Sequence, residues 1–254
     1  RHIGPFVRRL CESGAIDDFF FIRYTDPLFH LRLRLHLPDT SRYGEVFGAF
    51  YETFQPCVES RLVTTIACDT YVREVERYGG EAIEPTERLF GCDSACIIRI
   101  LELLRQQGQF GTYPSEEIRW RLGLLLNDDL LDAFGLSLTE KTALVTEAAK
   151  GYKAEFGFTA HRSTKQINDK YRALRDDLRH VMTTGLREEF PREILEGLAS
   201  PIKTMVPDGE LQGYLRSLIH MTMNRLFRSQ NRLCEMMVLE YLGREYTTLL
   251  KNRR

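Results

Sequence analysis

Residues 29–37 alternate strictly between two kinds of side chain, and this run constrains the fold more than any other feature. They read Phe-His-Leu-Arg-Leu-Arg-Leu-His-Leu. Successive side chains of a β-strand point to opposite faces, so this alternation predicts a strand with two different faces. One face carries Leu31, Leu33, Leu35 and Leu37, which we expect to enter a core; the other carries His30, Arg32, Arg34 and His36.

The neighbouring segments predict that this strand belongs to an antiparallel sheet. Residues 19–24 (Phe-Phe-Phe-Ile-Arg-Tyr) are strand-like, and Thr25-Asp26-Pro27 is a turn signal. Together with residues 29–37 they form an expected hairpin. The aromatic spacing of residues 43–54 predicts an amphipathic helix. The β-branched and aromatic weight of residues 62–76 predicts a further strand, ended by a turn at Tyr78-Gly79-Gly80.

From residue 86 onward the hydrophobic period becomes helical. Further helices are expected at about 115–134, 138–155, 165–182, 210–228 and 231–250. Loops or breaks are expected at Gly108–Gly111, Gly151–Gly157 and Pro201–Gly213. The sequence thus predicts an α+β fold with an N-terminal antiparallel sheet and a helix-rich C-terminal half, as a single domain over residues 1–254.

Composition excludes several classes of function. Lys+Arg is 35 and Asp+Glu is 36 in 254 residues, so the bulk positive charge of a duplex nucleic-acid binder is absent. No apolar run approaches the roughly 20 residues of a membrane helix. The chain starts at Arg1 without Met or a signal peptide, so we expect a fragment or an incomplete N-terminus. No GxGxxG, GxxxxGK[ST], HExxH or GxSxG motif occurs.

The cysteines predict neither disulfides nor a metal site. The six are Cys11, Cys57, Cys68, Cys92, Cys96 and Cys234, without a CxxC pair. Structural zinc sites usually use tighter, paired spacing. We therefore expect small reduced thiols in a cytoplasmic protein, with no metal and no cofactor.

Three segments could carry chemistry. The cationic face of 29–37 suits a carboxylate or phosphate, since a guanidinium fork binds either bidentately; the alternative is an ordinary solvated sheet face. Arg77 leads into a Gly-Gly turn and could reach a site at a strand's end, or could form a surface ion pair. In helix 210–228, His220 has Arg216 and Asn224 as i,i+4 neighbours. Imidazole has an unperturbed pKa of roughly 6.5, which suits proton transfer, although most helical histidines are packed or solvated.

Four segments together resemble one known family. They are Phe-Phe-Ile-Arg-Tyr-Thr-Asp-Pro-Leu-Phe-His-Leu-Arg-Leu-Arg (20–34), Asp-Thr-Tyr-Val-Arg-Glu-Val-Glu-Arg-Tyr-Gly-Gly (69–80), Phe-Gly-Cys-Asp-Ser (90–94) and His-Met-Thr-Met-Asn-Arg (220–225). In this order and spacing they look like the C-terminal elimination domain of class I lanthipeptide dehydratases, which also occurs as stand-alone thiopeptide-type bacteriocin biosynthesis proteins. The resemblance covers most of the chain, from residue 20 to residue 225.

The resemblance implies an enzyme that tailors ribosomally made peptides. A separate tRNA-dependent enzyme or domain glutamylates Ser or Thr of a precursor peptide that carries a leader, and the elimination domain expels glutamate to leave dehydroalanine or dehydrobutyrine. This would make the chain a carbon–oxygen lyase that binds neither nucleic acid nor membrane. Arg34, Arg77 and His220 fall at the family's catalytic positions. The implied substrate-binding residues are Arg32, His30, Arg23, Asn224 and Arg225.

Two alternatives stay open at this point. Relatives on the same scaffold catalyse a formal [4+2] cycloaddition of two dehydroalanines, which forms the pyridine of thiopeptides and releases the leader peptide. Retention of Arg34, Arg77 and His220 favours elimination, because each has a role in expelling an anion. A non-catalytic subunit that binds the precursor peptide along a sheet edge is the alternative from another class.

Overall fold

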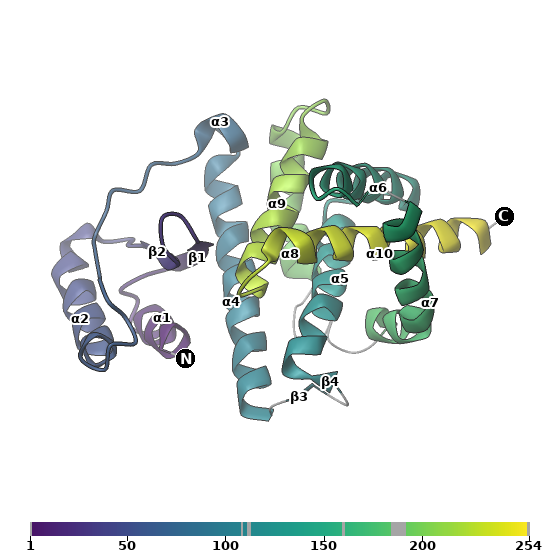
Figure 1. The fold of residues 1–254 in the computed structure, drawn as a ribbon. Helices are drawn as coiled ribbons and strands as arrows, with labels where there is room; N and C mark the ends of the chain where they lie inside the picture. The colour runs from purple at the N-terminus through teal and green to yellow at the C-terminus, as the bar shows by residue number, and fades with distance from the viewer. Residues whose placement is uncertain (1, 108, 111–112, 159–160, 184–191, 253–254) are drawn as a thin grey trace. The chain divides into compact units, whose positions relative to one another are not determined.

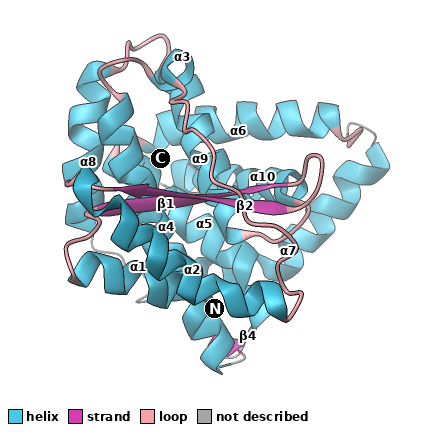
Figure 2. Ribbon diagram, turned by 90° about the vertical axis from the view of Figure 1, so that its left-hand side faces the viewer, coloured by secondary structure: helices cyan, strands magenta, loops and turns pink. Residues whose placement is uncertain are grey.

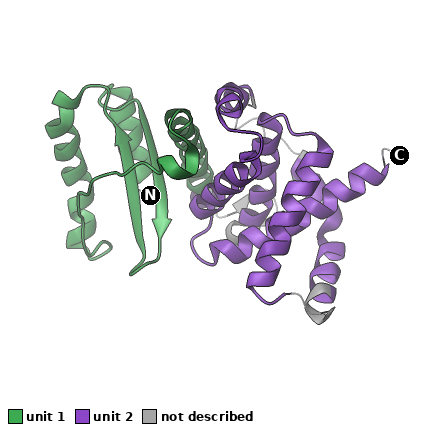
Figure 3. Cartoon of the chain, turned by 90° about the horizontal axis from the view of Figure 1, so that it is seen from above, with its two compact units in different colours: residues 1–103 green, residues 104–254 purple. Residues whose placement is uncertain are grey.

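The chain divides into two compact units, residues 1–103 and residues 104–254 (Figure 3). The structure, a computed structural model, describes residues 2–107, 109–110, 113–158, 161–183 and 192–252. Each unit has its own core, so each is described separately.

The centre of unit 1 is the predicted hairpin. Strand β1 (Asp18–Tyr24) pairs antiparallel with β2 (His30–His36) (Figure 2). In this register Phe20 lies opposite Arg34, and Tyr24 lies opposite His30. The connection contains Pro27, as the turn signal predicts. The hairpin, its antiparallel pairing and its turn are therefore confirmed.

Helices cover the hairpin within unit 1. They are α1 (Ile3–Glu12), the short η1 (Thr40–Arg42), α2 (Tyr43–Glu59), α3 (Val75–Tyr78) and α4 (Ile83–Gln107), and the strands lie between α2 and α4 (Figure 1). Phe6 of α1 packs edge-on against Phe54 of α2, and Phe20 of β1 contacts Phe90 of α4. The amphipathic helix predicted at 43–54 is confirmed and extends to Glu59. Helix α1 has no counterpart among the predicted elements.

The strand predicted at 62–76 is wrong. Residues 65–74 form no regular element, and Val75–Tyr78 is the short helix α3. High β-propensity reflects how well a side chain suits a paired, half-buried surface, and no strand pairs with this segment. Its Tyr71 instead packs edge-on against Phe20 of the hairpin.

The prediction of a buried leucine face on β2 holds only in part. Leu31 is 41% exposed, while Leu33 and Leu35 are half-buried. The reason is that the hairpin is covered on both sides: the adjacent residues Phe20 and Phe21 point to opposite faces and are 6% and 3% exposed. The face that carries the arginines is therefore not an open, solvated surface.

Unit 2 is a helical bundle. Its elements are the small β3 (Gln109–Phe110) and β4 (Tyr113–Pro114), followed by α5 (Ser115–Ala133), α6 (Leu138–Glu155), α7 (His161–Thr183), α8 (Arg192–Met205), α9 (Leu211–Leu226) and α10 (Asn231–Asn252). Ser137 caps α6 in a reciprocal capping box with Glu140, which fixes where this helix begins. The five predicted C-terminal helices are confirmed with small shifts of their ends.

Two predicted breaks in unit 2 are confirmed in part. The helices run further into the predicted ranges than expected: α6 continues through Gly151 to Glu155 before the turn at 156–158, and α8, a helix that we did not predict, continues through Pro201 to Met205 before the loop at 206–210. The third break, at Gly108–Gly111, falls partly outside the described residues. The fold class itself, α+β with an N-terminal antiparallel sheet and a helix-rich C-terminal half, is confirmed. Among the described helices, none combines the length and the apolarity needed to cross a membrane.

Candidate functional site

The cationic face of β2 is built jointly with aromatic residues of β1. Directly paired residues of an antiparallel hairpin point to the same side, so His30, Arg32 and Arg34 share their face with Tyr24 and other β1 side chains. This places positive charge against aromatic rings. His36, at the end of β2, instead pairs with Asp17, with 2.5 Å between Nδ1 and Oδ1.

Arg32 is held by stacking. Its guanidinium carbon lies 4.0 Å from the centre of the Tyr24 ring, and the Tyr24 and His30 rings stack at 5.3 Å. Its Nε donates to Nε2 of His30 at 3.2 Å, so Nε2 is an acceptor and Nδ1 carries the proton donated to the Leu28 carbonyl at 2.8 Å. His30 thus orients Arg32.

Arg34 lies on the same face and is also half-buried. Its guanidinium carbon lies 4.8 Å from the centre of the Tyr71 ring. Its Nε is buried and has no hydrogen-bond partner among the described residues. Within the described part of the chain, no carboxylate forms an ion pair with Arg34 or Arg32, so the guanidinium groups can accept an external anion.

Tyr71 connects Arg34 to the segment that carries Arg77. Burial, together with a hydrogen bond to Glu87, raises the pKa of Tyr71, so the hydroxyl stays protonated at neutral pH. Arg77 follows on α3, is 53% exposed and pairs with Glu74 at 3.0 Å. The structure therefore brings Arg34 against the segment that leads into Arg77, and the surface ion pair considered for Arg77 is present.

Arg23 does not join this cluster. It pairs with Leu31 in the hairpin register and so points to the opposite face from Arg32 and Arg34. Its guanidinium carbon lies 5.7 Å from the centre of the Phe21 ring. Grouping Arg23 with Arg32 in one substrate-binding set is therefore corrected by the strand register.

His220 lies on α9 of unit 2 and is fixed by a residue that the sequence did not indicate. Its Nδ1 is 2.8 Å from Oε2 of Glu235 on α10, a carboxylate that is only 2% exposed, while the imidazole remains 37% exposed. Local periodicity cannot reveal a contact between two helices. The segment 231–250 contains three glutamates, Glu235, Glu240 and Glu245, and the sequence does not indicate which of them contacts His220.

The other two predicted residues of unit 2 differ in accessibility. Asn224 is half-buried, one turn beyond His220. Arg225 is completely buried among the core residues of unit 2, so its side chain is not accessible in this structure.

The one group of carboxylates in the described residues that could hold a metal already holds an ammonium group. Asp128, Asp129 and Asp132 on α5 have oxygens within 4.8 Å of one another. The buried Lys141 lies 2.8 Å from Asp128 and 2.5 Å from Asp132. Lysine thus supplies the positive charge that a cation would supply there.

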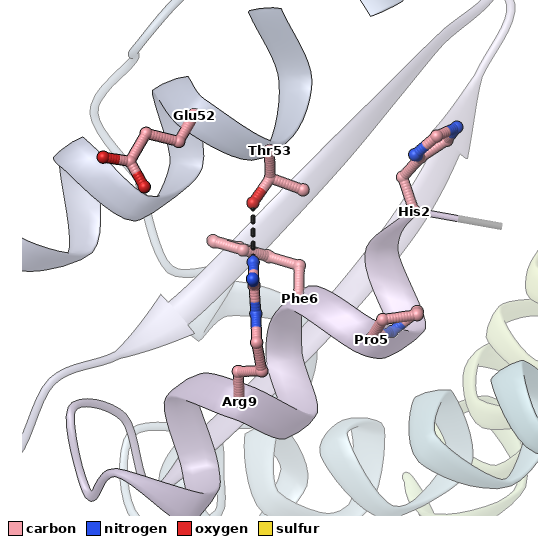
Figure 4. A pocket seen from close by; sticks show the side chains of 6 residues that line it. All are labelled: His2, Pro5, Phe6, Arg9, Glu52 and Thr53. Carbon is pink, nitrogen blue, oxygen red and sulfur yellow. Dashed lines mark hydrogen bonds between the residues drawn. The ribbon is translucent and has the colours of Figure 1, made fainter. Parts of the chain in front are cut away.

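A hollow of about 300 Å³ between α1 and α2 is separate from the predicted residues (Figure 4). Arg9 points across it and donates to Thr53 at 2.8 Å. None of the predicted site residues lines it. The lining residues are His2, Pro5, Phe6, Arg9, Glu52 and Thr53.

Comparison with known proteins gives concordant matches. The nisin biosynthesis protein NisB of Lactococcus lactis subsp. lactis is 36% identical over 102 residues, which are 40% of this chain and 10% of that protein. The epidermin biosynthesis protein EpiB of Staphylococcus epidermidis is 26% identical over 237 residues, 89% of this chain. The subtilin biosynthesis protein SpaB of Bacillus subtilis is 25% identical over 91% of this chain. The chain spans 22% of EpiB and 22% of SpaB.

A solved structure shares the fold. The crystal structure of the tRNA dependent lantibiotic dehydratase MibB from Microbispora sp. 107891 matches 98% of this chain and 26% of MibB, with a TM-score of 0.67 and 24% identity. The family described as the C-terminal part of lantibiotic biosynthesis dehydratases matches residues 1–247. This match runs through both units and includes the hairpin, α3 and α9, so the chain belongs to the lantibiotic biosynthesis dehydratase C-terminal family.

Proposed function

We propose that the chain performs the glutamate-elimination step of peptide dehydration in lanthipeptide or thiopeptide biosynthesis. The observation that carries this proposal is Arg34, a half-buried guanidinium whose Nε has no hydrogen-bond partner among the described residues. A buried donor without an acceptor costs free energy, and an anionic ligand would satisfy it. Family membership supports a peptide substrate, since the relatives are named for nisin, epidermin and subtilin biosynthesis.

The reaction needs both a base and an anion site. The base removes the α-proton of the esterified Ser or Thr, the freed electron pair forms the Cα=Cβ bond, and the Cβ–O bond breaks to release glutamate. A glutamyl ester carries one free carboxylate and forms a second one as it leaves. This charge change suits several arginines, and the enolate that develops before bond cleavage needs similar stabilisation.

We assign roles on this basis. Arg34 and Arg77 bind the glutamyl carboxylates and stabilise developing charge, and Arg32 supports them from the same face of β2. His220 is the acid/base residue, because its imidazole is partly exposed and a positioned imidazole is the commonest general acid or base. The peptide is glutamylated by a separate tRNA-dependent protein or domain.

Mass spectrometry of a glutamylated precursor peptide incubated with this chain alone tests the proposal. Loss of one glutamate per modified residue, leaving dehydroamino acids, is the expected result. If the glutamylated peptide stays intact while a dehydrated, azole-containing peptide is converted to a macrocycle with leader release, the chain is a pyridine synthase. Binding of both peptides without conversion would identify a non-catalytic subunit.

A further inference from the structure

A buried carboxylate holds one nitrogen of the His220 ring. Glu235 is 2% exposed, and its Oε2 lies 2.8 Å from Nδ1 of His220. With this carboxylate oxygen as the acceptor of the hydrogen bond, the proton lies on Nδ1. The ring then presents Nε2 as its second nitrogen, and the side chain retains 37% exposure through which a ligand can reach it.

A second possible donor lies near the same carboxylate. Burial, together with the nearby Glu235 carboxylate, raises the pKa of the Tyr152 hydroxyl on α6, so it stays protonated and able to donate to Glu235. The Tyr152 ring is itself confined by Phe156, which stacks on it, and by Arg232, whose guanidinium carbon lies 5.5 Å from the ring centre. Three helices thus converge on Glu235.

Two arginines, Arg232 and Arg216, lie near the contact between His220 and Glu235 in sequence or in space. Arg232, which lies over the Tyr152 ring, is paired with Glu155 at 2.6 Å. Arg216, one turn before His220 on α9, has a buried Nε without a hydrogen-bond partner among the described residues. A buried carboxylate is costly unless donors satisfy it, and His220 and Tyr152 supply those donors.

We propose that Glu235 is a positioning residue, which, supported by Tyr152, holds His220 with the proton on Nδ1 and leaves Nε2 to exchange a proton with the substrate. The inference rests on the proposed function for its catalytic consequence. Its geometric part, the position of the ring proton, can be tested without any turnover.

The experiment compares three variants of the full chain, each first shown by circular dichroism to be folded. Glu235→Gln and Tyr152→Phe disturb the arrangement. Glu240→Gln is the matched control, because Glu240 is another α10 carboxylate that binds α6, through Lys153 at 2.9 Å, without contacting His220. Nitrogen-15 NMR of the His220 ring reports which nitrogen is protonated, and glutamate release reports kcat and KM.

We expect the wild-type ring to carry its proton on Nδ1 and Glu235→Gln to lose this preference. Glu235→Gln should lower kcat about 10- to 100-fold with little change in KM, and Tyr152→Phe should have a smaller effect of the same kind. Glu240→Gln should keep kcat within about twofold. A wild-type ring protonated on Nε2, or an unchanged kcat in Glu235→Gln, would overturn the proposal. Absence of glutamate release by the wild type would instead refute the proposed function, while the NMR result would still decide the role of Glu235.

Discussion

Arg34 of β2 differs from other arginines of unit 1 in its surroundings. Arg73 and Arg42 form ion pairs with glutamates, whereas Arg34 lies against the Tyr71 ring and keeps a buried Nε free of hydrogen bonds within the described chain. A cation over an aromatic face is attracted to it while its in-plane donors stay available. At the scale of the residue, this environment is what makes Arg34 an anion-binding candidate.

Replacing Arg34 should abolish elimination without unfolding the chain. We expect Arg34→Ala to lower kcat at least about 100-fold, the usual effect of removing a donor that stabilises developing negative charge. Arg34→Lys keeps the charge but loses the planar fork, so it should recover only part of the activity. The measurement is glutamate release from the glutamylated peptide. Arg42→Ala, which removes a surface arginine of the same unit, is the control and should retain activity.

Asp18 should make stability depend on pH. Burial raises its pKa to about 6 from 3.8, so the folded state binds a proton more tightly than the unfolded state does. The resulting stabilisation is complete below about pH 4 and is lost as the pH rises through about 6. Asp18→Asn cannot lose this proton and should be more stable than the wild type at pH 8 by about 1 kcal/mol, after discounting for partial exposure.

Urea denaturation at pH 4.5 and pH 8 measures this difference. The advantage of Asp18→Asn should be present at pH 8 and much reduced at pH 4.5. An equal difference at both values would show that the substitution acts through packing rather than through the proton.

At the scale of the element, the sequence predicts what depends on local periodicity. The period-two run of β2 and the 3.6-residue period of α5, α6, α9 and α10 are local, and all of them were predicted. The segment 62–76 failed because its strand-like composition has no pairing partner. Helix α8 was missed because Pro201 suggested a break.

For the candidate site, too, the sequence predicted the local features but not the contacts between distant segments. Strand alternation indicated which cations share a face with Arg34, because parity is a local property. It could not indicate that Tyr71 or Glu235 would contact those residues, because each contact depends on packing between distant segments. The resemblance implied Arg23 together with Arg32, and only the strand register, in which Arg23 pairs with Leu31, shows that the two point to opposite faces.

Two glycines give opposite predictions for the helices of unit 1. A Cβ on Gly91 of α4 would overlap the carboxyl group of Asp18 on β1, so this partly buried side chain would have to move. We expect Gly91→Ala to destabilise the chain by about 1–3 kcal/mol. Nothing lies within 4 Å of a Cβ on Gly48 of α2, so Gly48→Ala should stabilise by about 0.5–1 kcal/mol. Thermal unfolding of the two variants is the test, and equal shifts in one direction would contradict it.

At the scale of the whole molecule, each unit has a separate core, and one probe reports on only one of them. The sole tryptophan, Trp120, lies on α5 of unit 2, where its ring contacts Tyr241 and Arg121. Tryptophan fluorescence therefore follows the unfolding of unit 2. Loss of helical circular dichroism follows both units.

We predict that the buried Lys141 is needed for the stability of unit 2. Lys141→Met would leave Asp128 and Asp132 without their ammonium partner. Breaking a buried pair on one side usually costs about 3–5 kcal/mol. We expect the midpoint of the tryptophan fluorescence transition in urea to fall accordingly. Lys150→Met, which removes an exposed lysine of the same helix, should leave the midpoint nearly unchanged.

The alternating register of the hairpin also limits how this chain can change during evolution. Arg34 and Arg32 share a face because they are an even number of residues apart, and each is matched to a partner on β1. Inserting or deleting one residue within β2 would turn every cation beyond that point to the opposite face, whereas a change of two residues would preserve the facing. Divergent members of the family should therefore differ in the length of the connection after Tyr24, or by even numbers of residues within β2.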